Sequence, residues 1–242
     1  MGTDARKLVA DGYPLEQVIT SDLHQGGPFF LPLRAINTGG KTPLYLTLFP
    51  LPLLAEFANL GHKLFKTTQE TYPIAFVPGD VFDPTHLEIT PPRASSAQAS
   101  MGNLPSDPAP DLRSLTSLNP LHGRVFAIHA SSFFHLFSEE KQLHLARALA
   151  GLLSPETGSM IFGVHISAPE KGFQPSLSGR DRGLWCHSPE SWTELWDGIV
   201  FEKNVVKVQT KLVNWQRRSS QPDAPQDATV TVTILVWSVT RL

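Results

Sequence analysis

The sequence predicts an α/β fold, in which a mostly parallel sheet covered by helices ends in an antiparallel hairpin. Short β-branched or apolar runs alternate with amphipathic helical segments through most of the chain, and this alternation is typical of parallel sheets with helices on both faces. The chain then closes with two β-rich runs, 205–215 and 229–240, joined by a polar turn segment. Its 242 residues are enough for one domain with a substantial core.

The individual elements follow from local patterns. A short helix is expected at 3–11, where Thr3 or Asp4 can cap the start and Gly12 can end it. A strong amphipathic helix is expected at 139–153, and Pro155 and Gly158 follow it. Further helices are expected at 56–66 and at 188–198, and strands at 17–23, 74–77, 124–130 and 159–166.

Two tracts depart from this alternation within what we predict to be a single domain over 1–242. The chain has 21 Pro and 17 Gly, and many of them fall in these tracts. Residues 26–55 are apolar and Pro/Gly-rich, and recurrent proline argues against both a helix and a central strand. We therefore expect 26–55 to be an irregular Pro/Leu-rich insertion. Residues 91–120, rich in Ser, Pro, Ala and Asp, are expected to form a flexible surface loop.

Charge and composition exclude several classes of protein. With 20 Lys and Arg against 22 Asp and Glu, the formal net charge is −2, which argues against a nucleic-acid partner. The only cysteine, Cys186, rules out a disulfide framework and fits a reducing, cytoplasmic location. The N-terminus lacks the apolar region of a signal peptide, and Pro50 and Pro52 break the longest apolar stretch, so no membrane partner is expected.

Candidate site residues lie where the predicted strands end, because ligands of open α/β sheets bind at the carboxyl ends of the strands. Asp22 ends the first predicted strand, and its carboxylate could accept hydrogen bonds from two ribose hydroxyls. Asp80 follows the next strand and could accept from an adenine amino group, while the backbone amide of Val81 could contact the ring edge. Taken singly, each acid is more often a solvated turn or helix cap. The pair, followed by an aromatic-rich third strand end, favours a nucleoside site.

Histidines and aromatic residues near the strand at 124–130 have competing interpretations. His129 and His135 could act as a base or bind metal, but their spacing matches no standard metal motif. The alternative is that His129 packs beside a ligand and His135 covers the following helix. Phe133 and Phe134 are expected to be core residues and part of a pocket wall. Cys186 and His187 suggest a nucleophile, but no third partner is evident, and no catalytic residue is assigned.

Several segments carry a family resemblance. They are DARKLVADGYPLEQVITSDLH (4–24), GHKLFKTT and FVPGDVFDP (within 61–84), the stretch HGRVFAIHASSFFHLF through GSMIFG (122–163), and CHSPESWTELW (186–196). On these motifs the chain resembles class I S-adenosylmethionine-dependent methyltransferases of fungal secondary metabolism, which include meroterpenoid carboxyl O-methyltransferases. The resemblance implies a Rossmann-like sheet whose last strand is antiparallel to the others.

The resemblance also implies roles for individual residues. Asp22 would contact the cofactor ribose, with Leu23 beside it, and Asp80 and Val81 would contact the adenine. His129 and Ala130 would line the methionine end of the cofactor and the mouth of the substrate site. Phe133, Phe134 and His135 would border the substrate pocket. Relatives are often dimers, so a homodimer is a further expectation.

Two departures from the family pattern stand out. Family members carry a first strand and a glycine-rich turn before the helix that begins here at residue 3, so we expect that strand and turn to be missing. Residues 26–55 also fall where relatives have only a few residues. The LTLFPLPLLA end of this tract resembles a translated pyrimidine tract, and a retained intron together with a missed upstream exon is one hypothesis for it.

Three functional hypotheses follow. The first is methyl transfer from S-adenosylmethionine to a carboxylate or hydroxyl of a small polyketide or terpenoid. The second is an inactive methyltransferase-like remnant without cofactor binding. The third is another nucleotide binder such as a reductase, which the missing glycine turn and the absence of a Tyr-x-x-x-Lys pair weaken.

Overall fold

A computed structural model describes residues 10, 13–14, 17–22, 44–49, 63, 66–68, 70–71, 75–94, 110–174, 183–218 and 229–242. Of the helix expected at 3–11 it describes only Ala10, which is helical, and of the helix expected at 56–66 only Lys63 and Lys66. Leu23 lies outside the described residues, as does most of 26–55.

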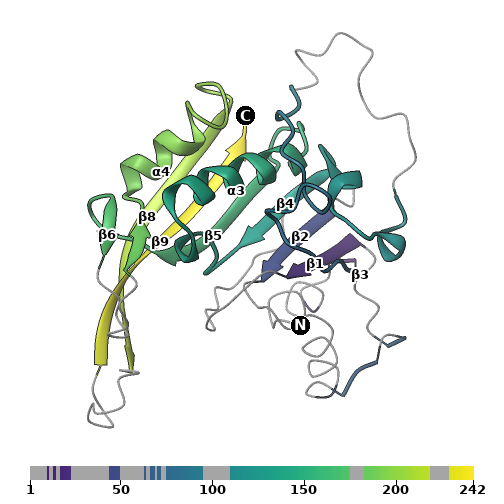
Figure 1. Cartoon of the computed structure of the whole chain (residues 1–242), viewed down its shortest axis with the longest axis horizontal. Coiled ribbons are helices and arrows are strands. Elements are labelled where there is room, and N and C mark those ends of the chain that lie inside the picture. Colours follow the sequence, from purple (N-terminus) through teal and green to yellow (C-terminus); the bar gives the residue numbers. More distant parts are fainter. Residues whose placement is uncertain are drawn as a thin grey trace.

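The described strands form one seven-stranded sheet in the order β3-β1-β2-β4-β5-β9-β8 (Figure 1). Five of them are mutually parallel: β1 (Val18–Asp22), β2 (Leu44–Phe49), β3 (Ala75–Phe76), β4 (Val125–Ala130) and β5 (Met160–Ile166). At the other side β9 (Thr229–Arg241) pairs antiparallel with β5, and β8 (Val206–Arg218) pairs antiparallel with β9. The predicted parallel sheet with an antiparallel C-terminal hairpin is confirmed.

The strand β2 corrects the prediction for 26–55. We expected no central strand in this tract, yet Leu44–Phe49 lies between β1 and β4 and pairs with both. The physical reason is visible in the sequence, because Pro43 and Pro50 flank the run LYLTLF without interrupting it. A proline just outside a strand removes no ladder hydrogen bond from within it. The strand β2 therefore has a paired strand on each side, β1 and β4.

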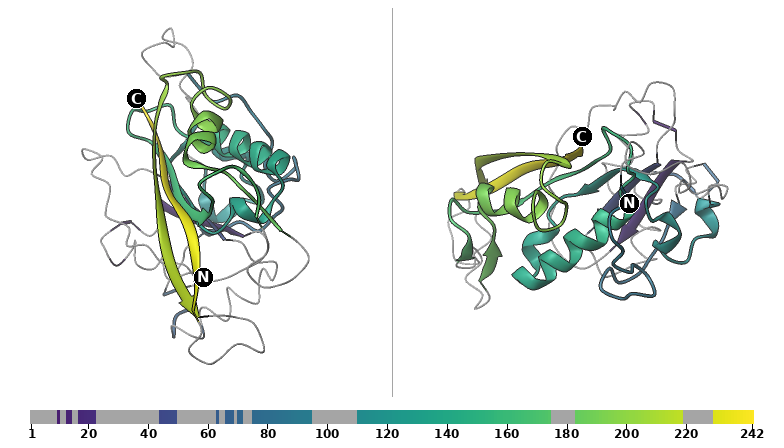
Figure 2. Two further views of the ribbon diagram at one scale, coloured as in Figure 1. Left: turned by 90° about the vertical axis from the view of Figure 1, so that its left-hand side faces the viewer. Right: turned by 90° about the horizontal axis from the view of Figure 1, so that it is seen from above.

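One face of the sheet carries the core. A single row of side chains, aligned by strand register, runs across five strands, and all of its members are fully buried: Ile19, Leu46, Ile128, Ile161 and Val239. The helices α3 (Glu139–Leu152) and α4 (Pro189–Trp196) contribute buried residues to the same cluster. Both helices lie on this one face (Figure 2). The opposite face carries the alternating set Thr20, Thr47, His129 and Phe162.

The two helices begin with the caps that their sequences predict. Ser138 caps α3 by accepting from the backbone N–H of Lys141. Ser188 caps α4 in a reciprocal capping box with Ser191, and Pro189 occupies the first helical position. These caps fix the point at which each helix leaves the carboxyl-terminal edge of the sheet.

The structure describes only residues 91–94 and 110–120 of the tract 91–120, and residues 110–120 are packed against the core. Two short 3-10 helices lie there, η2 (Leu112–Ser114) and η3 (Asn119–Leu121). Leu118 is fully buried, and the Asn119 side chain bonds to backbone groups of the segment 84–88. The flexible-loop prediction is therefore wrong for 110–120, because apolar residues at its end anchor it to the core.

A small hairpin was missed altogether. Strands β6 (Gly172–Gln174) and β7 (Leu184–Cys186) pair antiparallel, and β7 directly precedes α4 in the chain. Phe173 is 71% exposed and contacts Trp185 edge to face at 5.3 Å. Three-residue strands give too short a pattern for sequence periodicity to detect.

Candidate active site

The parallel strands bring several predicted residues to one edge of the sheet. Asp22 at the end of β1 is in register with Phe49 at the end of β2, and Leu48 is in register with Ala130 at the end of β4. The segment after β3 stays against β1, where the N–H of Val77 donates to the carbonyl of Thr20 at 2.9 Å. Asp22, the turn that follows Val77 and the end of β4 therefore share this edge.

Asp80 shapes the turn after β3. Its side chain is exposed, and its Oδ1 accepts from the backbone N–H of Phe82 at 2.8 Å. Its carbonyl accepts from the N–H of Asp83 at 3.0 Å. Val81, between them, is fully buried in the core. The buried side chain of Val81 thus holds this turn against the core. The Asp80 carboxylate remains exposed to solvent, where it can accept a hydrogen bond from a polar ligand.

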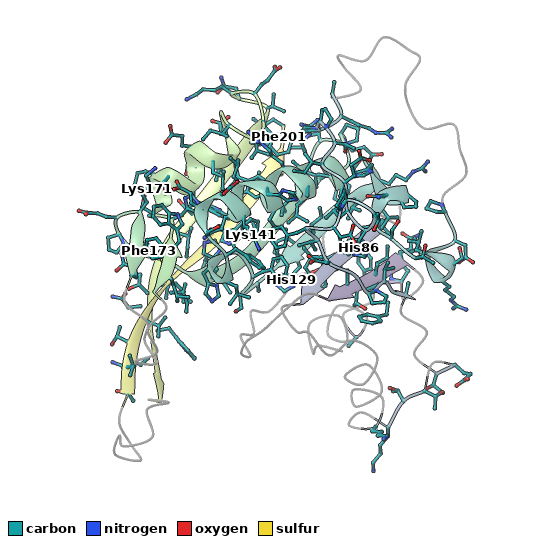
Figure 3. The ribbon with its side chains drawn as sticks, in the orientation of Figure 1. His86, His129, Lys141, Lys171, Phe173 and Phe201 are labelled. Atoms are coloured by element: carbon teal, nitrogen blue, oxygen red, sulfur yellow. The ribbon has the colours of Figure 1, made fainter. Side chains whose placement is uncertain are left out.

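His86 is a residue at this edge that the sequence reasoning missed. It is 5% exposed and lies 3.5 Å from Ser21 Oγ through its Nε2 (Figure 3). A Cβ on Gly79 would overlap its ring, so only glycine fits between this histidine and the Asp80 turn. Burial lowers the pKa of His86, while the charges of Asp83 and Asp80 oppose that shift. No motif in the sequence marks His86; only the fold places it behind the turn.

His129 lies at the end of β4 in a polar arrangement of its own. Its Nε2 is 2.7 Å from Ser131 Oγ. Ser131 Oγ is itself held in place, because it accepts a hydrogen bond from the backbone N–H of Val164 at 3.2 Å. The His129 ring lies 5.3 Å from that of Phe162. Burial lowers the pKa of His129 to about 4, so the imidazole is neutral at pH 7. Its Nδ1 is buried and has no hydrogen-bond partner among the described residues.

The turn after β4 bends sharply. Ser132 adopts a φ of 54°, a conformation unusual for a residue other than glycine. Its N–H donates to the carbonyl of Val164 at 2.6 Å, which holds the turn against β5. The short helix η4 (Phe134–Leu136) begins directly afterwards. This turn therefore sets the position of the aromatic segment 133–137.

Phe133 and Phe134, predicted as core and pocket wall, are both fully buried. The Phe134 ring meets those of Trp192 at 4.9 Å and Trp237 at 5.7 Å, in edge-to-face geometry. This part of their predicted role, core packing, is observed. His135 is 7% exposed, and burial lowers its pKa to about 4.

Two further histidines, His165 and His187, have their rings against Trp192. His165 is almost fully buried, and its pKa is held well below 6.5 by desolvation first and then by His135 and His187. Its ring centroid is 4.6 Å from that of Trp192. Burial also lowers the pKa of His187 to about 4, with a smaller contribution from Lys171. Within the described ranges no three such side chains are grouped as a metal site requires.

Other candidates have structural explanations. Cys186 is free and buried, and burial raises its pKa to about 11, so the thiol is protonated at neutral pH and a poor nucleophile. Trp192 and Trp196 are core residues, as their helical spacing suggests. Neither α3 nor α4 nor any other helix in the described part of the chain is a candidate membrane span.

The described sheet, with five parallel strands and an antiparallel C-terminal pair at one side, has the mixed, mostly parallel arrangement that the family resemblance implies. Among curated proteins, the O-methyltransferase phiE of Fungal sp. (strain ATCC 74256) is 25% identical over 202 residues, covering 84% of this chain and 47% of that protein. The Asnovolin E/Chermesin D methyltransferase nvfJ of Aspergillus novofumigatus is 25% identical over 198 residues, covering 82% and 49%. Over most of its length the chain is thus similar, at about a quarter identity, to methyltransferases of fungi.

Other comparisons set the limits of this relationship. The methyltransferase ausD of Penicillium brasilianum is 23% identical over 201 residues, covering 83% of this chain and 58% of its own length. The chain therefore spans about half the length of the curated relatives it matches. Among solved structures, a 1,6-didemethyltoxoflavin-N1-methyltransferase of Burkholderia thailandensis gives a TM-score of 0.44 at 10% identity, covering 98% of this chain and 76% of that one. No protein-family model matches the chain.

Proposed function

We propose that this chain carries a methyltransferase activity that uses S-adenosylmethionine and acts on a carboxylate or hydroxyl of a small polyketide or terpenoid. The main support is the similarity of 84% of the chain to an O-methyltransferase. The sheet adds support, because ligands of open α/β sheets bind at the carboxyl ends of the strands, and Asp22 and Ala130 end neighbouring parts of the parallel sheet.

The proposed cofactor contacts follow the strand ends. Asp22 would bind the ribose, with Leu23 next to it in the chain. The exposed carboxylate of Asp80 would accept from the adenine amino group, next to the amide of Val81. His129 and Ala130 would line the methionine end. The buried, unpaired Nδ1 of His129 fits this role, because a polar ligand group there would satisfy a hydrogen-bonding position that no described residue fills.

When bound, S-adenosylmethionine supplies an activated methyl group, so the protein mainly has to orient the acceptor and exclude water. A carboxylate acceptor is ionised at neutral pH and needs no base. A hydroxyl acceptor would need one, and the pKa values of about 4 make His129 and His135 weak candidates for that role. We therefore assign no catalytic base.

One observation favours a second candidate, namely that the chain is an inactive methyltransferase-like protein that does not bind S-adenosylmethionine. The central strand β2 is followed in sequence by Pro50-Leu51-Pro52. Family members instead carry a glycine-rich turn after the strand at the centre of the sheet, and glycine lets the backbone approach the ligand closely. Under this alternative the chain would fold, with β2 at its centre, but bind no nucleoside.

Calorimetric titration with S-adenosylhomocysteine separates the two candidates. The proposal predicts saturable binding that Asp80→Ala weakens at least tenfold. Asp111→Ala is the matched control, because Asp111, the N-cap of η2, also accepts from the N–H two residues after it, at 3.1 Å, but is not among the proposed cofactor contacts. Absence of binding to a folded protein at millimolar ligand would favour the second candidate.

Location and assembly complete the proposal. The single, free and buried Cys186 supports a reducing, cytoplasmic compartment. A homodimer is expected only from the family resemblance, and size-exclusion chromatography with light scattering would test it.

A further inference from the structure

His86 lies between the two parts of the candidate site that would hold a nucleoside. One part is the end of β1, where Ser21 precedes Asp22, and the other is the turn after β3 that carries Asp80. The His86 side chain is 5% exposed and is labelled in Figure 3. The proposed cofactor contacts use both acids, so the spacing of these two parts decides which nucleoside fits.

On the β1 side the histidine contacts Ser21. The Ser21 hydroxyl donates to the carbonyl of Val77 at 2.7 Å, and Nε2 of His86 lies 3.5 Å from the same oxygen, a long hydrogen-bond distance. Because the only hydroxyl proton is directed at Val77, Ser21 Oγ can only accept from the imidazole. This contact therefore assigns the ring proton of the neutral histidine to Nε2.

On its other side the ring packs against Gly79, the residue before Asp80. The φ of Gly79 is not in the left-handed range, so its backbone conformation is open to other residues. A Cβ at this position would nevertheless overlap the His86 ring, and the three nearest atoms all belong to that ring, Nδ1 first. The ring is therefore in direct contact with the start of the turn.

The turn also closes on the backbone of His86. The N–H of His86 donates to the carbonyl of Asp83 at 2.9 Å, and the N–H of Asp83 donates to the carbonyl of Asp80 at 3.0 Å. Burial lowers the pKa of His86 from 6.5, although the charges of Asp83 and Asp80 oppose this shift. The imidazole is therefore mainly neutral at pH 7, and it acts on the turn through packing.

We propose that His86 is a positioning residue for base specificity: it fills the space between Ser21 and Gly79 and so holds the Asp80 turn where it accepts adenine and rejects hypoxanthine. The inference rests on the proposed function, in which the Asp80 carboxylate and the Val81 amide contact the base. Adenine offers these groups an amino donor and a nitrogen acceptor. Hypoxanthine offers a carbonyl oxygen and an N–H instead, so both contacts become unfavourable.

S-adenosylhomocysteine and S-inosylhomocysteine are the probes, because they differ only at this edge of the base. We expect the unchanged protein to bind the adenosyl compound at least tenfold more tightly. His86→Ala should reduce this ratio to less than a third, measured by calorimetry on protein shown to be folded by circular dichroism. Leu195→Ala is the control, because Leu195 is equally buried but lies in α4. It should lower stability and leave the ratio unchanged, which separates positioning from a general loss of stability.

Gly79→Ala tests the same contact from the other side, and it replaces His86→Ala if that variant does not fold. With the ring in place, the new Cβ should displace the turn, so the ratio and the free energy of unfolding should both fall. In Gly79→Ala/His86→Ala the Cβ enters space that the ring has left, so the change at Gly79 should cost little more. Urea denaturation of the four proteins measures this coupling.

An unchanged ratio in His86→Ala or in Gly79→Ala would overturn the inference and leave the proposed function intact. Equal binding of the two compounds by the unchanged protein, or additive effects of the two substitutions on stability, would also overturn it. A protein that binds neither compound loses the proposed function and the specificity together. That outcome is distinguishable, because the stability measurements need no ligand and still show whether His86 holds the turn.

Discussion

The indole N–H of Trp237 donates a hydrogen bond to Nδ1 of His165 at 3.0 Å. Trp237 is on β9 and His165 on β5, and both are buried. Because an indole N–H can only donate, Nδ1 of His165 must be unprotonated and the ring proton must be on Nε2. This bond joins the antiparallel C-terminal strands to the parallel part of the sheet.

Trp237→Phe removes that donor and leaves a buried imidazole nitrogen unpaired. We expect the free energy of unfolding to fall by roughly 1–3 kcal/mol beyond the loss of ring volume. Urea denaturation measures the change, with Trp215→Phe on β8 as the control, since Trp215 is 38% exposed. In a double-mutant cycle with His165→Phe, strictly additive effects would show that the bond contributes nothing.

Stability should depend on pH through the buried histidines. Folding lowers the pKa values of His129, His135 and His187 to about 4 from an ordinary 6.5. Between those values the unfolded chain binds more protons, so stability is complete above pH 6.5 and falls as the pH drops toward 4. For His129 the loss is roughly 3 kcal/mol at its limit. Urea denaturation at pH 7.5 and pH 4.5 measures this loss of stability. In His129→Gln the free energy of unfolding should depend less on pH than in the unchanged protein. An equal pH dependence in both proteins would show that folding does not lower the pKa of His129.

The central strand β2 gives a sharp mutational test. Leu46 is fully buried in the row shared by β1 and β4. Leu46→Ala should lower the free energy of unfolding by roughly 2–5 kcal/mol, and Leu46→Asp should prevent folding. Thermal denaturation of the purified variants checks both. If Leu46→Asp folds normally, Leu44–Phe49 is not a buried central strand, and the prediction of an irregular insertion at 26–55 would stand.

Gly163 permits β4 and β5 to approach at the candidate site. A Cβ on Gly163 would overlap the carbonyl of Ala130, so Gly163→Ala should force the strand ends apart. We expect a loss of roughly 1–3 kcal/mol in stability and weaker binding of S-adenosylhomocysteine, measured by denaturation and calorimetry. A stable variant that binds normally would show that the strand ends are not part of the binding geometry.

Elements with local sequence signals could be predicted from the sequence, whereas features that depend on packing could not. The helix predicted at 139–153 is α3, and the helix at 188–198 is α4, because capping residues and helical periodicity are local signals. The six predicted strands appear within a few residues of their expected bounds. The strand β2 is hard to predict, because the prolines that flank it, Pro43 and Pro50, make its sequence resemble the proline-rich tract around it. His86 and the histidines around Trp192 could not be grouped from sequence, since residues distant in the chain meet only through packing.

The most direct measurement maps where S-adenosylhomocysteine binds, using backbone amide shifts in ¹H–¹⁵N spectra. The account predicts saturable shifts concentrated at the carboxyl-terminal edge of the parallel strands, at Val81, Ala130 and Ser131, and little change at the opposite edge near Val125. Shifts scattered over the surface, or none in a well-folded protein at millimolar ligand, would contradict it.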